Sequence, residues 1–121
     1  MAAILLVDDS ASVRRTVKIA LTGEGHNVME AADGAEGLAK AQAGRFDLVI
    51  TDLNMPVMDG LTMIRQLRQK SAQAGLPVLF LTTESDAGVK AQAKAAGATG
   101  WLTKPFNPEQ LLKTVARILA R

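Results

Sequence analysis

The side chains in this sequence that could carry out chemistry are carboxylates, hydroxyls and one lysine, and each follows or ends a short apolar run. In order along the chain they are Asp8, Asp9, Asp52, Thr82, Thr83 and Lys104. Three carboxylates that lie together cannot all stay ionised without compensation, and a divalent cation is the simplest compensation. Oxygen ligands without histidine or cysteine favour Mg²⁺ or Mn²⁺ over Zn²⁺. A metal, a lysine and a hydroxyl around one aspartate would form a site for phosphoryl transfer.

These side chains can meet only if the apolar runs are strands of one sheet. We predict strands over residues 3–7, 27–31, 46–51, 77–81 and 99–102. The first and third contain continuous apolar runs, which are typical of strands buried on both faces of a parallel sheet. In such a sheet, function is placed outside the carboxyl ends of the strands, and only the second strand offers little there, Glu30 at most.

A helix is predicted after each strand, because a capping residue and helically spaced apolar residues follow each one. The predicted N-caps are Ser10, Asp33, Asp59, Ser85 or Asp86, and Asn107. Glycines end the first, second and fourth helices, and Asn107 opens a capping box with Gln110. The alternation predicts an α/β fold in which a five-stranded parallel sheet is doubly wound as (βα)5, with helices on both faces.

Length and composition exclude several classes of protein. The chain's 121 residues correspond to one domain over residues 1–121, and the absence of cysteine excludes disulfides and thiolate chemistry. The net charge is +2; only Arg14, Arg15 and Lys18 approach a basic cluster, and we interpret them as a solvated helix face. No apolar run approaches the ~20 residues that span a bilayer, and no signal peptide precedes the first strand. We expect a cytoplasmic protein that binds neither nucleic acid nor membrane.

Four motifs, each at the end of its own predicted strand, resemble those of one family. They are LVDDS at 6–10, DLNMPVMDG at 52–60, LTT at 81–83 and KPF at 104–106. Over essentially its whole length the chain resembles the receiver domain of bacterial two-component response regulators, and among these the stand-alone chemotaxis regulators. The resemblance implies a flavodoxin-like receiver fold with the strand order 2-1-3-4-5.

The resemblance also implies a role for individual residues at the metal and acceptor positions. Asp52 is expected to be the phosphoacceptor and a ligand of Mg²⁺. Asp9 is expected to bind Mg²⁺ directly and Asp8 through a water, while Asn54 offers its backbone carbonyl to the metal.

Further roles are implied for residues around the phosphoryl group. Lys104 is expected to contact that group and to precede Pro105 through a cis peptide bond. Thr82 is expected to turn toward the group and transmit the change. Asn54 and Glu84 occupy positions that tune autodephosphorylation in the family, and Trp101 stands where the family often has the Tyr or Phe of the switch.

The function implied is that of a stand-alone response regulator, phosphorylated on Asp52 by a sensor histidine kinase of the CheA-like type. Downstream we expect a protein target, with the flagellar motor switch as a candidate, and a phosphatase. The chain ends just after the last predicted helix, so we expect no attached output domain. We expect a monomer that catalyses only its own phosphotransfer and autodephosphorylation and is otherwise not an enzyme.

Rival functions differ in what they require of the sequence. A phosphohydrolase of the haloacid dehalogenase type would place its nucleophile after the first strand, with a second aspartate where this chain has Asn54. A flavin-binding electron carrier would need a phosphate loop where Asp8 and Asp9 would repel phosphate. Two narrower alternatives stay open: a receiver that serves as a phosphate sink, and a binding module that works without phosphorylation.

Overall fold

Strands and helices alternate along the chain in the computed structural model, which describes residues 2–69, 75–83 and 87–120. The elements of these ranges are β1 (Ala3–Val7), α1 (Ala11–Gly23), β2 (Asn27–Ala31), α2 (Gly34–Ala43), β3 (Leu48–Thr51), α3 (Gly60–Arg68), β4 (Val78–Thr82), α4 (Ala87–Ala95), β5 (Gly100–Thr103) and α5 (Pro108–Leu119). The strands form one parallel sheet in the order β2-β1-β3-β4-β5. The predicted doubly wound α/β fold is therefore confirmed. None of the described helices is both long and apolar enough to cross a membrane.

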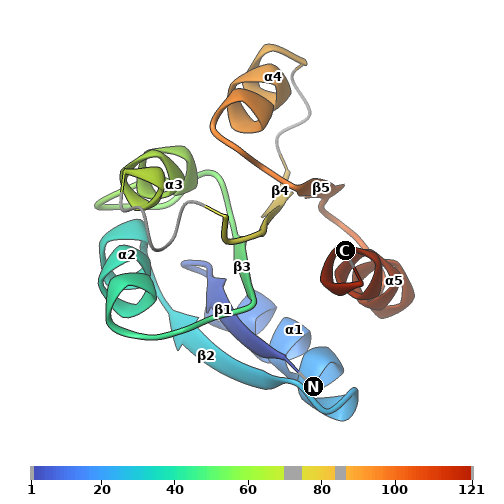
Figure 1. Ribbon diagram of the computed structural model, residues 1–121. Coiled ribbons are helices and arrows are strands. Elements are labelled where there is room, and N and C mark those ends of the chain that lie inside the picture. Colours follow the sequence, from blue (N-terminus) through green and yellow to red (C-terminus); the bar gives the residue numbers. More distant parts are fainter. Residues whose placement is uncertain (1, 70–74, 84–86, 121) are drawn as a thin grey trace.

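The sheet separates two hydrophobic clusters. Because successive side chains of a strand point to opposite faces, Leu5 and Val7 pack against α2 and α3, whereas Ile4 and Leu6 pack against α1 and α5. Figure 1 shows the same division, with α1 and α5 on one side of the sheet and α2, α3 and α4 on the other. Burial on both faces explains the continuous apolar runs of β1, β3 and β4.

Local capping bonds begin most of the helices, as predicted. The described caps that accept a backbone amide three residues ahead are Ser10, Asp33, Asp59 and Asn107. At α5 the box is reciprocal, since Gln110 Oε1 also accepts the amide of Asn107 at 3.2 Å. At α2, Glu36 reaches one residue further back, to the amide of Ala32 at 2.7 Å. The predicted caps of α4, Ser85 and Asp86, lie outside the described residues.

Three of the predicted strands have boundaries that differ by one or two residues from those of the structure. The third strand was predicted from residue 46 but begins at Leu48, because the side chain of Asp47 accepts the amide of Ala3 at 2.8 Å. The fourth and fifth strands lie one residue later than predicted. Pro77 has no N–H to donate, while Thr82 is still paired with Thr103. Thr82 is therefore the last residue of β4.

Helix α4 is the helix that buries least among those described. Its one buried residue is Ala93, whereas α3 buries four large apolar side chains: Leu61, Met63, Ile64 and Leu67. Val89, the largest apolar side chain of α4, is only partly buried. Since burying a Leu, Ile or Met contributes about 1.5–3 kcal/mol, α4 is held far more weakly than α3.

The loop between β3 and α3 is closed by two backbone contacts that leave no room for a side chain. The amide of Gly60 donates to Leu53 O at 2.9 Å, and a Cβ at Gly60 would lie 2.1 Å from Asp52 O. The amide of Gly34, in α2, donates to Met58 O at 3.0 Å, and a Cβ there would lie 2.2 Å from the same oxygen. Both ends of the loop are therefore fixed by close approach of the backbone.

Replacing Gly60 by Ala should lower the free energy of unfolding by about 1–3 kcal/mol, because the new Cβ must displace the carbonyl of Asp52. Urea denaturation would measure the change. Gly23→Ala is the matched control: that position in α1 has no atom within 4 Å of a Cβ, and alanine is favoured over glycine in a helix by up to about 1 kcal/mol. Equal effects of the two substitutions would contradict the close contact at Gly60.

Candidate functional site

Three carboxylates converge at the carboxyl ends of two neighbouring strands, β1 and β3. Oxygens of Asp8, Asp9 and Asp52 all lie within 4.8 Å of one another. The convergence follows from the topology, because β1 and β3 are parallel neighbours with Val7 paired to Thr51. The amide of Asp52 extends this pairing by donating to Val7 O at 2.9 Å. Asp8 is buried, Asp52 is partly buried and Asp9 is exposed, so the cluster opens to solvent on one side.

Lys104 joins this cluster from the strand at the edge of the sheet. Its Nζ lies 2.8 Å from Asp8 Oδ2 and 3.2 Å from Asp52 Oδ2. Lys104 directly follows β5, and its amide donates to Thr82 O at 2.8 Å. The peptide bond between Lys104 and Pro105 is cis, as the family resemblance implied. The structure therefore brings the predicted lysine onto the predicted acceptor.

The charge state of Lys104 is set by two opposing effects. Burial alone would lower its pKa, but the hydrogen bond and charge of Asp8, together with those of Asp52, outweigh burial and raise the pKa of Lys104 above its usual value. The ammonium group is therefore more firmly protonated in the folded protein than in the unfolded chain.

The buried carboxylate of Asp8 and the partly buried one of Asp52 are each held by one amide and one ammonium. Asp8 Oδ1 accepts the amide of Ser10 at 2.9 Å, and Asp52 Oδ1 accepts the amide of Leu53 at 2.7 Å. Their other oxygens face Lys104. The hydrogen bonds fix the rotamers of both side chains before any ligand arrives.

The donor set fits a hard divalent cation. The three carboxylates outweigh the charge of Lys104, and all the candidate ligands are oxygens. Mg²⁺ is bound through one or two carboxylates with waters and phosphoryl oxygens, in open sites of this kind. Asn54, whose backbone carbonyl is a further predicted ligand, lies exposed in the loop two residues after Asp52.

The other predicted site residues around the phosphoryl position lie at the end of β4. Thr82 is fully buried at the end of β4, next to Lys104 through the backbone bond described above. Thr83 follows it and is exposed. Glu84, a predicted tuning residue, lies outside the described residues.

Trp101 lies on β5, beneath the weakly packed helix α4. Its ring centroid is 6.0 Å from that of Phe80, and Lys90 Nζ of α4 lies 5.5 Å from the Trp101 ring. The indole Nε1 is buried and meets no hydrogen-bond partner within the described ranges. A buried donor without a hydrogen-bond partner is destabilising, so the indole N–H does not favour this orientation of the ring.

Arg14 was missed by the sequence interpretation, which assigned it to a solvated helix face. Its side chain is only 18% exposed; its Nε lies 3.3 Å from Glu30 Oε1, and its Nη1 donates to the backbone carbonyl of Asp8. The i, i+4 spacing of Arg14 and Lys18 was the available signal, because it puts both on one face of α1. Both do pair with Glu30 at the end of β2.

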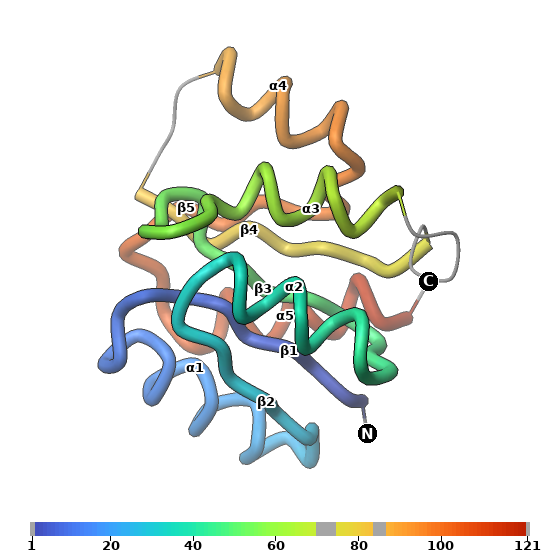
Figure 2. The backbone as a smooth tube through the Cα atoms, turned by 90° about the vertical axis from the view of Figure 1, so that its left-hand side faces the viewer, coloured from blue at the N-terminus to red at the C-terminus, as the bar shows by residue number. Residues whose placement is uncertain are grey.

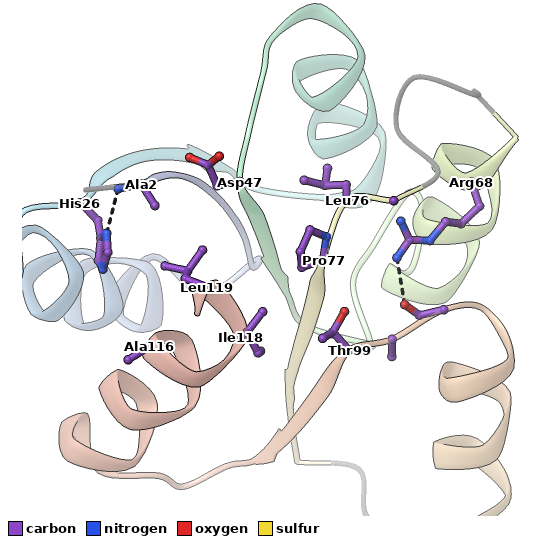
Figure 3. Close-up of a pocket in the computed structure, with 13 residues that line it drawn as sticks. Ala2, His26, Asp47, Arg68, Leu76, Pro77, Thr99, Ala116, Ile118 and Leu119 are labelled. Atoms are coloured by element: carbon purple, nitrogen blue, oxygen red, sulfur yellow. Dashed lines mark hydrogen bonds between the residues drawn. The ribbon is translucent and has the colours of Figure 1, made fainter. Parts of the chain in front are cut away.

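A large hollow lies at the opposite end of the strands, where their amino ends begin. It has a volume of about 1090 Å³ and is lined by residues just before the strands, including His26, Asp47 and Thr99 (Figure 3). In Figure 2 both chain ends lie on this side of the molecule. Its polar groups already have partners: His26 Nδ1 accepts the amide of Ala2, and Arg68 donates to Gly97 O. This hollow therefore lacks the convergent unsatisfied charges of the carboxylate site.

Comparison with known proteins agrees with this geometry. Residues 4–116 match the family model of the response regulator receiver domain. The chemotaxis response regulator CheY4 of Vibrio cholerae is 52% identical, with a TM-score of 0.93 and 98% of each chain covered. The receiver domain of the sensor histidine kinase PA1611 of Pseudomonas aeruginosa is 28% identical, with a TM-score of 0.91 over 99% of this chain and 98% of that one. That structure holds a magnesium ion in its active site cleft.

Relatives differ in how much of their length this chain spans. Protein PilH of Pseudomonas aeruginosa is 38% identical over 120 residues, which cover 99% of this chain and 99% of PilH. Two other curated relatives are longer, and the chain spans about half their length, 48% and 54%. The match thus includes both proteins of similar length and larger proteins.

Replacing Lys104 by Met should lower the free energy of unfolding by about 3 kcal/mol near neutral pH, because it leaves the buried carboxylate of Asp8 without its cation. The raised pKa of Lys104 determines how its contribution to the free energy of unfolding changes with pH. The stabilisation is fully present below the unfolded-state value of 10.5 and is lost as pH rises through the higher folded-state value. The gap between wild type and variant should therefore close only above that value. Urea denaturation with a chelator, between about pH 7 and 11.5, measures it.

Lys113→Met is the control for the Lys104 substitution. Lys113 pairs with Glu109 on the surface of α5, where both side chains are 76% exposed, so its loss should cost less than about 1 kcal/mol. A Lys104 effect as small as that of Lys113, or one that vanishes at neutral pH, would contradict the ionic role of Lys104.

Proposed function

This chain belongs to the response regulator receiver family of two-component systems, and on that premise we propose that it accepts a phosphoryl group on Asp52 and so changes its affinity for partner proteins. One observation carries the proposal. Asp52 lies within 4.8 Å of the carboxylates of Asp8 and Asp9, and at 3.2 Å from the ammonium of Lys104. This is the arrangement that a phosphoryl acceptor requires: a nucleophile with a metal site on one side and a cation on the other.

The reaction proposed for Asp52 is a direct transfer. The donor is a phosphohistidine of the kinase. One carboxylate oxygen of Asp52 forms a bond to phosphorus while the bond between phosphorus and the histidine nitrogen breaks. Asp52 thereby becomes an acyl phosphate. The bond from the amide of Leu53 to Asp52 Oδ1 holds the carboxylate in place during this exchange.

Mg²⁺ is the cofactor we propose, held by Asp9 and Asp52, by Asp8 through a water, and by the backbone carbonyl of Asn54. When bound, it would offset negative charge on the carboxylates and on the transferred group. The all-oxygen donor set supports this assignment, as does the magnesium ion in the PA1611 receiver domain.

Lys104 and Thr82 are proposed to stabilise the phosphorylated state. In the unphosphorylated protein Lys104 is shared between Asp8 and Asp52, so a phosphoryl group on Asp52 would offer its ammonium a stronger acceptor. Hydrogen bonds to charged groups contribute about 1.5–3 kcal/mol each. Moving a two-state equilibrium from about 1:99 to 99:1 takes about 5.5 kcal/mol, so two or three new bonds suffice. Thr82 would provide one of them, and Trp101, Asn54 and Glu84 would tune the switch and the lifetime of the phosphoryl group.

For the biological setting we propose chemotaxis. The support is the similarity to CheY4 over nearly the whole of both chains. The kinase would be CheA-like, and the output would be a change in binding to a downstream protein such as the flagellar motor switch. Beyond its own phosphotransfer and autodephosphorylation, the chain would catalyse no reaction.

Incubation with Mg²⁺ and acetyl phosphate should add one phosphoryl group to the wild-type chain and none to Asp52→Asn. Intact mass measurement reads this directly, and a chelator should abolish the adduct. Asp47→Asn is the matched control, because Asp47 is an exposed carboxylate just before β3, at the other end of the same strand, and its variant should still be labelled.

Fast self-hydrolysis could hide the adduct, so beryllium fluoride should be tested beside it while the fluorescence of Trp101 is recorded. An adduct on Asp52→Asn, or no response of the wild type in either assay, would contradict the assignment of Asp52 as the phosphoacceptor. The chain would then be a receiver that binds partners without phosphorylation.

The chemotaxis proposal is tested by transfer from two purified, prephosphorylated histidine kinases of the same organism, one CheA-like and one from a different pathway. Transfer from the CheA-like kinase should be at least about tenfold faster, equivalent to about 1.4 kcal/mol of the barrier. Equal rates, or a preference for the other kinase, would reject chemotaxis and leave acceptance at Asp52 untouched.

A further inference from the structure

Arg14 contacts the metal-binding loop without reaching the metal site itself. It lies in the first turns of α1, and its Nη1 donates to the backbone carbonyl of Asp8, the residue between β1 and Asp9. The carbonyl of Asp8 belongs to the peptide unit that links Asp8 to Asp9. Its direction therefore sets the position from which the side chain of Asp9 starts.

Glu30 at the end of β2 fixes the orientation of the Arg14 guanidinium. Its Oε1 lies 3.3 Å from Arg14 Nε. The planar guanidinium is therefore held at two of its nitrogens, Nε by Glu30 and Nη1 by the carbonyl of Asp8. Glu30 is itself held by Lys18, whose Nζ lies 3.3 Å from Glu30 Oε2, and by Lys40 of α2, whose Nζ donates to Glu30 O. The side chain of Arg14 is only 18% exposed, so this geometry is not that of a solvated surface arginine.

We propose that Arg14, oriented by Glu30, is a positioning residue that holds the Asp8–Asp9 peptide in the direction required for Mg²⁺ binding. This inference rests on the proposed function of the site. Groups that orient metal ligands from behind typically change metal affinity by about 10–100-fold when they are removed.

The sign of the effect separates positioning from simple charge. Arg14 is a cation near the metal site, so if it acted only through its charge it would repel Mg²⁺, and its removal would tighten binding. If it positions the loop, its removal weakens binding. The two possibilities therefore predict opposite changes in the same measurement.

The experiment is calorimetric titration of the full chain with Mg²⁺ alone, with urea denaturation of each variant alongside. Arg14→Ala should weaken Mg²⁺ binding by about tenfold or more, and Arg14→Lys, which keeps one donor and the charge, should recover part of it. Glu30→Gln keeps Arg14 but weakens its orientation, so a smaller loss is expected. It also serves as the test if Arg14→Ala does not fold.

The neighbouring Arg15 is the matched control. Arg15→Ala removes the same charge from an exposed position of α1, one residue further along the chain. It should leave Mg²⁺ affinity within about twofold or raise it slightly, as loss of a repelling charge predicts.

Opposite results would overturn the inference in a recognisable way. Unchanged or tighter binding by folded Arg14→Ala, or equal losses in Arg14→Ala and Arg15→Ala, would reject positioning while the proposed function stands. Absence of Mg²⁺ binding by the wild-type chain would instead defeat the proposed function, and the positioning role would fall with it.

Discussion

Mutual repulsion of three carboxylates is the constraint around which this edge of the molecule is built. Two like charges about 4 Å apart repel by roughly 4 kcal/mol at the effective dielectric near a protein surface. The fold holds Asp8, Asp9 and Asp52 together despite this, because β1 and β3 are packed from both faces and cannot move apart without exposing core. Lys104 offsets part of the repulsion, and the remainder is what would attract a divalent cation. The stability of the apolar sheet thus maintains a charge arrangement that is unfavourable by itself.

Sequence predicted the fold well where the signal was local. Apolar runs identified the strands, and capping residues such as Asp33, Asp59 and Asn107 begin their helices as expected. Strand ends shifted by a residue because pairing depends on the neighbouring strand, as with Thr82 and Thr103. The role of Arg14 was missed because it depends on Glu30, which is distant in sequence and whose position follows only from the sheet order.

The loop after Asp52 shows how a site can be rigid without being part of a helix or strand. Close backbone contacts at Gly34 and Gly60 fix it at both ends. Between them Val57 has a φ of 68°, and the amide of Met58 donates to Pro56 O at 2.7 Å, a three-residue turn that is rare and strained for a β-branched residue. Such strain persists only where the surroundings over-determine the backbone, and here they do. The loop that carries Asn54 is thereby held close to one conformation.

Helix α4 lies on the same sheet under much weaker constraint, with Ala93 as its one buried residue among those described. Substitutions on the remaining positions of α4 cost little folding energy as long as they favour a helix. A bacterium that carries several such regulators could therefore diversify this helix between gene copies and keep the sheet and the charge cluster unchanged. If partner proteins contact α4, such copies would come to bind different partners without any change in the carboxylate cluster.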